Sequence, residues 1–266
     1  MTKKILYFLL FFSAFAFSQT TLPTIQSNKL AFKDGEWLKY KMSYSNFLNA
    51  GFSTISVKEI NYKKKEAFHI VGKGKTTGLI GLFFKVRDNY QSYMFKNTLK
   101  PFLFIRKINE GGYTKNKKIT FNHETKEATV TNYKHNTQKK YPISSDIQDM
   151  LSSLYYLRNK KLSNLKIGAK IELKLFFDQE INNFKLQFLG KQILRTKFGK
   201  IKTLKFRPIV QKGRVFKSEE SVTIWVTDDE NKIPIKIKAA LAVGSLRADL
   251  VSFKGLAHPF NIIFNN

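Results

Sequence analysis

The run of residues that most resembles a chemical motif is the glycine- and lysine-rich segment Gly72–Gly78. It echoes the loop in which backbone amides and a lysine hold a nucleotide phosphate. The complete loop needs a glycine five residues before Gly74 and a helix after it. This chain has His69 at the first position, and strand-like sequence broken by glycines follows the run. A nucleotide site is therefore not expected.

Residues that bind metals or act in catalysis are not grouped in a way that predicts a reaction. The four histidines occur singly, without the spacing of a zinc site: they are His69, His123, His135 and His258. The acidic run 228–231 lacks the spaced ligands and central glycine of a calcium loop. No Gly-x-Ser-x-Gly elbow is present, and the first turn of a helix explains Asp146 and Asp149. We expect no metal, no cofactor and no enzymatic activity.

A short apolar segment, Gly78–Phe84, is flanked by glycine and by basic residues. If it is buried, it is a strand or turn that packs on the core. If it is exposed, it would form a rim that enters a membrane or the mouth of an apolar pocket, with lysines at the lipid headgroups. The predicted ligand-binding residues are Leu79, Ile80, Leu82, Phe83 and Phe84 on this rim, with Trp37, Tyr40 and Tyr44 inside the protein.

The N-terminal residues 1–18 have the pattern of a secretory signal peptide. Lys3 and Lys4 supply the positive end, Ile5–Phe17 is apolar, and a small residue on each side of Phe17 marks a cleavage site before Gln19. The apolar stretch is too short to span a membrane, and no later segment is long and apolar enough. The chain has no cysteine, so neither a lipoprotein anchor nor a disulfide is expected. We expect an exported protein of the periplasm or envelope.

The chain carries 47 lysines and arginines against 19 acidic residues, a formal net charge of +28, which loss of Lys3 and Lys4 lowers by two to +26. Such a field attracts anionic partners, which outside the cytoplasm means an anionic lipid or another envelope component rather than nucleic acid. The alternative is a charge that serves only solubility. The seven arginines are scattered, and dispersed lysine favours solubility over a dedicated phosphate site.

Most of the chain after residue 30 alternates apolar and polar residues at period two, which is typical of strands with one buried face. In Trp37–Tyr44 the even-numbered residues form the apolar side. Short turns such as Asn49–Gly51 and Glu110–Gly112 separate the strands and favour antiparallel pairing. We predict a mainly β fold, a curved antiparallel sheet or half-open barrel of about 11–13 strands. The expected organisation is a flexible segment 19–28 followed by one β-rich domain, 29–266.

One segment has helical spacing instead. Residues 145–159 are predicted to form the one substantial helix, capped by Ser144 or Ser145. A lone amphipathic helix in a β protein usually covers an open sheet face or the end of a barrel. Its apolar residues Met150, Leu154 and Leu157 are therefore predicted to lie in the core.

Four spaced patches resemble a family of exported bacterial proteins, the domain of unknown function 3108. They lie between Lys29 and Val251 in the family's order, and they are Phe32-x2-Gly35-Glu36-x-Leu38-x-Tyr40-x3-Tyr44 followed by Ala50-Gly51, Asp149-x2-Ser152-x-Leu154-Tyr155-Tyr156-Leu157-Arg158, Trp225-x3-Asp229-x4-Pro234, and Gly244-Ser245-x4-Leu250. The resemblance implies an envelope protein of β-rich fold without an established activity.

The leading hypothesis is a non-enzymatic binding module for an amphiphilic or apolar, lipid-like ligand held in the concavity of a curved sheet. The first alternative is a structural or assembly factor that binds a protein partner in the envelope. A second is an integral outer-membrane barrel, whose strands alternate in the same way. The predicted helix and the lysines on the polar side of the strands, as at Lys58, Lys170 and Lys174, disfavour the barrel. Ligand identity and oligomeric state are not specified by the sequence.

Overall fold

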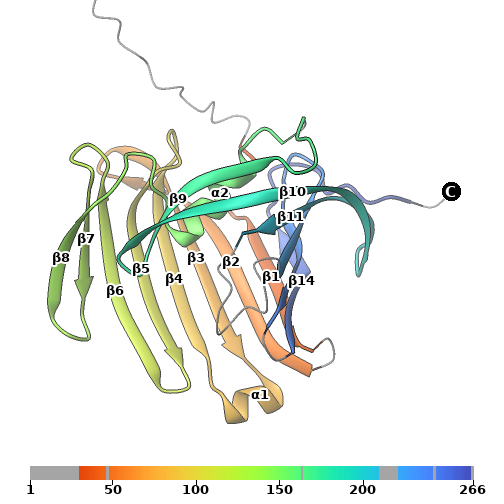
Figure 1. Ribbon diagram of the computed structural model, residues 1–266, viewed down its shortest axis with the longest axis horizontal. Coiled ribbons are helices and arrows are strands. Elements are labelled where there is room, and N and C mark those ends of the chain that lie inside the picture. The colour runs from red at the N-terminus through yellow and green to blue at the C-terminus, as the bar shows by residue number, and fades with distance from the viewer. Residues whose placement is uncertain (1–29, 46–47, 163, 210–220, 242–243, 265–266) are drawn as a thin grey trace, which may run out of the picture.

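The fold is one large antiparallel sheet that curls around a helix (Figure 1). The structure is a computed structural model and describes residues 30–45, 48–162, 164–209, 221–241 and 244–264. The strands of the first half are β1 (Trp37–Tyr44), β2 (Leu48–Tyr62), β3 (Lys65–Thr76), β4 (Arg87–Phe95), β5 (Pro101–Glu110), β6 (Tyr113–Asn122), β7 (Glu127–Asn132) and β8 (Thr137–Pro142). Those of the second half are β9 (Lys170–Phe177), β10 (Glu180–Thr196), β11 (Gly199–Pro208), β12 (Val222–Thr227), β13 (Pro234–Ala240) and β14 (Ser245–Lys254). The two helices are α1 (Gly78–Phe83) and α2 (Met150–Arg158).

The order of the strands follows the chain except at one place. Strands β1 to β8 form one meander and β9 to β14 a second, and the pairing of β1 with β14 joins the two meanders into a sheet of 14 strands. Turn chemistry accounts for much of each meander because short reversals link most of the neighbouring strands, as between β5 and β6 and between β10 and β11. The β1–β14 pair links two ends of the chain that local sequence cannot connect. It makes the sheet continuous.

The two edges of the sheet, β8 and β9, are neighbours in sequence but do not pair. The chain between them carries α2, which lies on the concave side of the sheet and contacts β3, β4 and β9. Backbone bonds from Gln148 to Lys174 and from Phe176 to Gln148 attach the segment before the helix to β9. The sheet is therefore open, with a helix-bearing segment spanning its two edges.

Helix α2 begins at Met150 because Asp149 caps it. One carboxylate oxygen of Asp149 accepts bonds from the backbone amides of Leu151 and Ser152, at 2.8 and 2.9 Å, and the Ser152 hydroxyl in return accepts a 2.9 Å bond from the Asp149 amide. This reciprocal capping box satisfies the free amides of the first turn. The other carboxylate oxygen accepts a 2.6 Å bond from Ser92 of β4, which fixes the helix start against the sheet.

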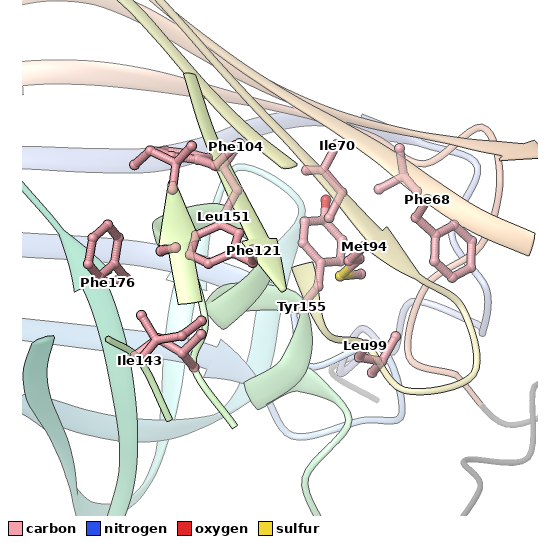
Figure 2. Close-up of a cluster of buried hydrophobic side chains, with 14 of the residues drawn as sticks. Phe68, Ile70, Met94, Leu99, Phe104, Phe121, Ile143, Leu151, Tyr155 and Phe176 are labelled. Atoms are coloured by element: carbon pink, nitrogen blue, oxygen red, sulfur yellow. The ribbon is translucent and has the colours of Figure 1, made fainter. Parts of the chain in front are cut away.

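The largest core cluster lies between α2 and the concave face of the first meander (Figure 2). Leu151 and Tyr155 of the helix pack against buried residues of β3 and β4, and Gly72 leaves room for Leu151, whose methyl would lie 3.2 Å from an added Cβ. Two further clusters fill the concave side under the second meander, around Leu38 and Leu250 and around Phe188. Apolar burial on this scale is the main stabilising term of a fold without disulfides.

The β9–β10 turn bridges the gap that the open sheet leaves. Asp178 accepts a 2.6 Å bond from Arg106 of β5 and a 3.0 Å bond from Lys115 of β6. Phe176 packs edge-on against Phe121 at 6.0 Å between ring centroids. The cavity beside this turn measures only about 10 Å³, about enough for one water molecule. The concave side beside this turn is packed with protein side chains.

The predicted mainly β, curved antiparallel fold is confirmed, and three details were wrong. The sheet has 14 strands rather than 11–13. The helix spans Met150–Arg158 rather than 145–159, because Asp149 and not a serine is the cap and because residue 148 is held in a bridge to β9. Met150 is 37% exposed rather than core, whereas Leu154 and Leu157 are partly buried against the core clusters.

The predicted signal peptide, residues 1–18, and the segment 19–28 lie outside the described residues. Of the helices within the described ranges, none has the length and apolar character needed to cross a membrane.

The capping carboxylate predicts a pH dependence of stability. Burial raises the pKa of Asp149 from 3.8 to about 6, so its protonated form is the one that folding favours. The contribution is fully present below pH 3.8 and is lost as the pH rises to about 6. We expect a loss on the order of 3 kcal/mol in the free energy of unfolding.

The measurement is urea unfolding between pH 4 and pH 7 of the wild type and of Asp149→Asn, which keeps a good capping group without a titrating proton. The wild type should lose stability relative to Asp149→Asn over this range. A difference that stays constant with pH would contradict the prediction. Asp149→Ala, which removes the cap, should be less stable than both at every pH.

Candidate functional site

The apolar segment singled out from the sequence forms α1, at the tip of the β3–β4 hairpin (Figure 1). None of its residues is buried. Leu79 is 65% exposed, Leu82 79%, Phe83 89% and Phe84 52%, while Ile80 is half-buried. Large apolar side chains that lie side by side in water mark a surface for a partner or a membrane. Of the two readings that the sequence allowed for this segment, the structure has the exposed one.

The backbone around α1 is held firmly although its side chains are exposed. The Thr76 hydroxyl donates to the Phe84 carbonyl and accepts from the Val86 amide, both at 2.9 Å. The Thr77 amide donates to the carbonyl of Ala50 on β2. The next residue is Gly51, where an added Cβ would lie 2.0 Å from the Lys75 carbonyl oxygen, so only glycine permits this approach of β2 to β3. The tip is therefore a fixed feature of the hairpin.

A groove of about 620 Å³ begins at α1 and runs along the face of β1 to β4 that points away from the core. Its residues come from cross-strand rows in register: Lys39, Thr54, Lys73 and Asn89 form one row, and Phe52, Lys75 and Arg87 belong to the next. Trp37 lies at the far end, and Thr77, the N-cap residue of α1, at the near end. The groove and the apolar tip are thus continuous.

Four cations and one carboxylate line this groove. Lys39 lies over the Phe52 ring at 4.6 Å, and Arg87 donates to the carbonyl oxygens of Val86 and Thr76 at 2.8 and 3.2 Å. Lys73 and Lys75 are exposed. The carboxylate is Asp88, and burial, followed by the nearby Glu110, raises its pKa to about 6. The site therefore combines aromatic rings with a local excess of positive charge.

The eight predicted binding residues do not form a single lining. The five rim residues lie together on and beside α1, and Trp37 lines the groove. Tyr40 differs from Trp37 by an odd number of positions in β1, so it points to the other face of the sheet, where it is 4% exposed in the core. Tyr44 lies at the end of β1 against Gly244. Tyr40 and Tyr44 are therefore separate from the groove.

Sequence reasoning missed Lys39 and Phe52 as partners of the rim. Period-two alternation already puts Lys39 on the face opposite Leu38, and Phe52 on the same face as Thr54. What the alternation does not give is the register that sets Lys39 beside Thr54 and Lys73. A row of basic residues contributed by different strands cannot be predicted until that register is known.

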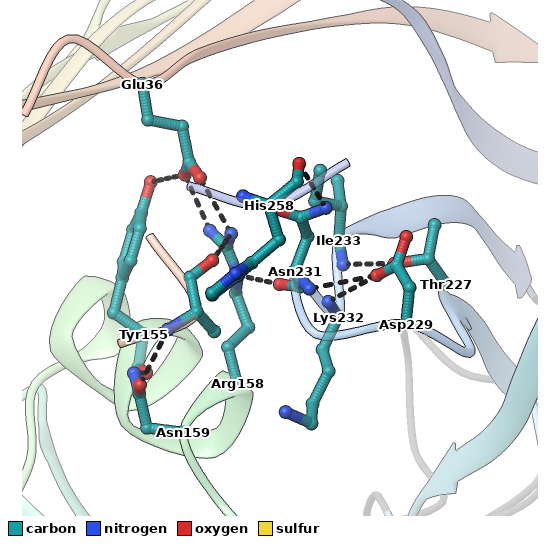
Figure 3. A network of polar contacts seen from close by, with 11 residues as sticks. Glu36, Tyr155, Arg158, Asn159, Thr227, Asp229, Asn231, Lys232, Ile233 and His258 are labelled. Atoms are coloured by element: carbon teal, nitrogen blue, oxygen red, sulfur yellow. Dashed lines mark hydrogen bonds and ion pairs between the residues drawn. The ribbon is translucent and has the colours of Figure 1, made fainter. Parts of the chain in front are cut away.

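The described part of the chain also holds a buried ion pair (Figure 3). The Arg158 guanidinium donates to both carboxylate oxygens of Glu36, at 2.6 and 2.7 Å, and to the carbonyl oxygens of Ala31 and Asn231, each at 2.8 Å. Tyr155 donates to the same carboxylate at 3.1 Å. Burial raises the pKa of Tyr155, which therefore remains a neutral donor. Every charge here is matched by a partner.

The network extends to the turn between β12 and β13 and to the C-terminal segment. Asp229 accepts bonds from the backbone amides of Asn231 and Lys232, both at 3.0 Å. The Asn231 side chain bonds to the His258 amide and to the carbonyls of His258 and Pro259. Four segments distant in sequence are tied together in this way, and the role of the network is structural.

Comparison with known proteins supplies the family. A family model described as a protein of unknown function, DUF3108, matches residues 39–251. The chain belongs to this family. None of the curated proteins matches it.

The DUF3108 chain shares its fold with a beta-barrel-like protein of the domain of unknown function DUF1849 from Brucella abortus. The two are 10% identical, the TM-score is 0.55, and the match covers 84% of this chain and 98% of that one. A Bacteroides fragilis protein with a YmcC-like fold matches at 9% identity and a TM-score of 0.32, over 84% of this chain and 97% of that one.

The DUF3108 patches named from the sequence meet in the buried network. Glu36 comes from the first patch, Tyr155 and Arg158 from the second, and Asp229 from the third. Their roles are structural, whereas the exposed rim lies outside the patches, and Trp37 and Lys39 of the groove occupy positions that the first patch leaves unspecified. Among the described residues, no group of three or more His, Cys, Asp or Glu side chains is placed to hold a metal ion.

Breaking the buried pair should cost far more stability than breaking a surface pair. Arg158→Met leaves Glu36 charged and buried, and we expect a loss of about 3–5 kcal/mol in the free energy of unfolding. The double variant Glu36→Gln/Arg158→Met should recover part of this loss, because no uncompensated charge is left. Urea unfolding measures all three proteins.

The matched control is Lys140→Met, which breaks the surface pair with Glu127 and should cost less than about 1 kcal/mol. A loss from Arg158→Met no larger than that of the control would show that the buried pair does not hold the fold together.

Proposed function

We propose that this DUF3108 protein is an exported, non-enzymatic binding module of the cell envelope whose ligand is amphiphilic or apolar and lipid-like. The observation that carries the proposal is the exposure of Leu79, Leu82, Phe83 and Phe84 on a firmly held tip. Exposed apolar side chains lower the solubility of a protein. Contact with a lipid or another apolar ligand would remove these side chains from water. The signal-like residues 1–18 support export, and the absence of cysteine supports a chain without a lipid anchor.

The ligand is placed on the outer face and tip rather than in the concavity. The concave side is occupied by α2 and three clusters of buried side chains. The groove on the opposite face begins at Thr77, where α1 starts, and contains the rings of Trp37 and Phe52. An acyl chain or other apolar group would contact α1, and the polar part of the ligand would face the groove.

The test is binding of the purified protein to vesicles of phosphatidylcholine with phosphatidylglycerol, measured by sedimentation. Leu82→Ser/Phe83→Ser should weaken binding at least tenfold, because each inserted side chain contributes on the order of 1.5–3 kcal/mol. Since both residues are exposed, the variant should unfold at the same urea concentration as the wild type.

The matched control removes exposed apolar side chains elsewhere. Ile167 is 76% exposed and Phe264 81% exposed, and neither lines the groove. Ile167→Ser/Phe264→Ser should bind vesicles like the wild type. Equal binding by the α1 variant and the wild type would refute the proposal. Recovery of one stable protein partner whose binding is lost in the α1 variant, with no vesicle binding, would favour the assembly factor instead.

A further inference from the structure

We infer that the groove beside α1 binds the anionic phosphate headgroup of a membrane lipid while α1 enters the apolar layer. This inference rests on the proposed function and specifies the ligand class of the same site. The evidence is the composition of the groove and its position. Lys39, Lys73, Lys75 and Arg87 line it together with a single carboxylate, Asp88.

Among the residues that the structure describes, no carboxylate forms an ion pair with the cations of the groove. Elsewhere in the described residues lysines pair with carboxylates, as Lys96 does with Glu59 at 2.6 Å and Lys191 with Asp228 at 2.8 Å. Lys39, Lys73, Lys75 and Arg87 form no ion pair with the described part of the chain. Like charges in neighbouring rows repel one another, and an anion placed between them removes that repulsion.

The geometry separates a headgroup region from an apolar region. Lys75 and Arg87 lie opposite each other in register on β3 and β4, immediately before and after the turn that carries α1. Lys73 and Lys39 lie one row further from the tip. A protein that inserts α1 into a bilayer therefore brings the first row of cations to the level of the phosphates and the groove to the headgroups above them.

The groove also explains why aromatic rings accompany the cations. Trp37 and Phe52 lie among the lysines, with Lys39 over the Phe52 ring at 4.6 Å and Lys254 over the Trp37 ring at 5.8 Å. Aromatic side chains with one wet edge are suited to the membrane interface, where an apolar body and a polar surround coexist. A cluster serving solubility alone has no need of two half-buried aromatic rings or of a groove of about 620 Å³.

The experiment compares phosphatidylcholine vesicles with and without phosphatidylglycerol. The wild type should bind the anionic vesicles at least tenfold more tightly, and Lys73→Glu/Lys75→Glu should abolish this preference. The matched control is Lys139→Glu/Lys161→Glu, which changes the net charge equally at two exposed lysines outside the groove. The control should keep most of the preference.

Equal weakening by the two charge variants would overturn the inference, because net charge alone would then explain it. Equal binding of the wild type to both kinds of vesicle would also overturn it. The proposed function would stand in that second case as long as the α1 variant still lost binding. The two ideas therefore fail in different measurements.

A spectroscopic readout locates the headgroup. The chain has two tryptophans, Trp37 and Trp225, so Trp225→Phe leaves Trp37 as the reporter inside the groove. The Trp37 emission should change when anionic vesicles are added. In the protein that also carries Lys73→Glu/Lys75→Glu, the same vesicles should leave the emission unchanged. Glycerol phosphate in solution should give this change only at much higher phosphate concentration. Saturation by glycerol phosphate at the vesicle phosphate concentration would assign the groove to a soluble phosphate and overturn the membrane-lipid assignment.

Discussion

The buried pair of Glu36 and Arg158 is the interaction on which the arrangement of the other elements depends. The guanidinium at the end of α2 bonds to the N-terminal segment through Glu36 and Ala31, and to the β12–β13 turn through Asn231. A buried charge is tolerated only when its partners are all in place. The pair therefore fixes the helix, both meanders and the chain ends relative to one another, and it does so where β1 and β14 join the sheet.

That arrangement has a consequence for where a ligand can lie. An open sheet curled around a helix has two faces, and here the concave one is filled by α2, by the core clusters and by the β9–β10 turn. Chemistry available to other molecules is consequently on the outer face and at the hairpin tips. The rigid hairpin of β3 and β4 presents α1, and the register of β1 to β4 presents the groove. In the proposed function, the core and the binding surface therefore lie on opposite sides of one sheet.

The basic residues of the protein form two groups, dispersed surface lysines and the cations of the groove, and only the fold distinguishes them. In the sequence, lysine is spread along the chain and favours solubility. In the structure, several exposed lysines pair with carboxylates. Four cations from three strands nevertheless meet in one groove with a single carboxylate. These residues are spread over the sequence from Lys39 to Arg87. They become neighbours only because hydrogen bonding between the strands sets them side by side.

The sequence by itself determined the mainly β fold, the central helix, the family and the apolar character of the segment 79–84, because alternation, capping chemistry and local hydrophobicity are properties of neighbouring residues. It did not determine that the segment 79–84 is exposed, that Met150 is exposed, or that Lys39 and Phe52 lie beside the rim. Those outcomes depend on strand register and on the β1–β14 pairing. Register is set by packing between distant segments, so only the tertiary structure decided where the charges and rings of this protein meet.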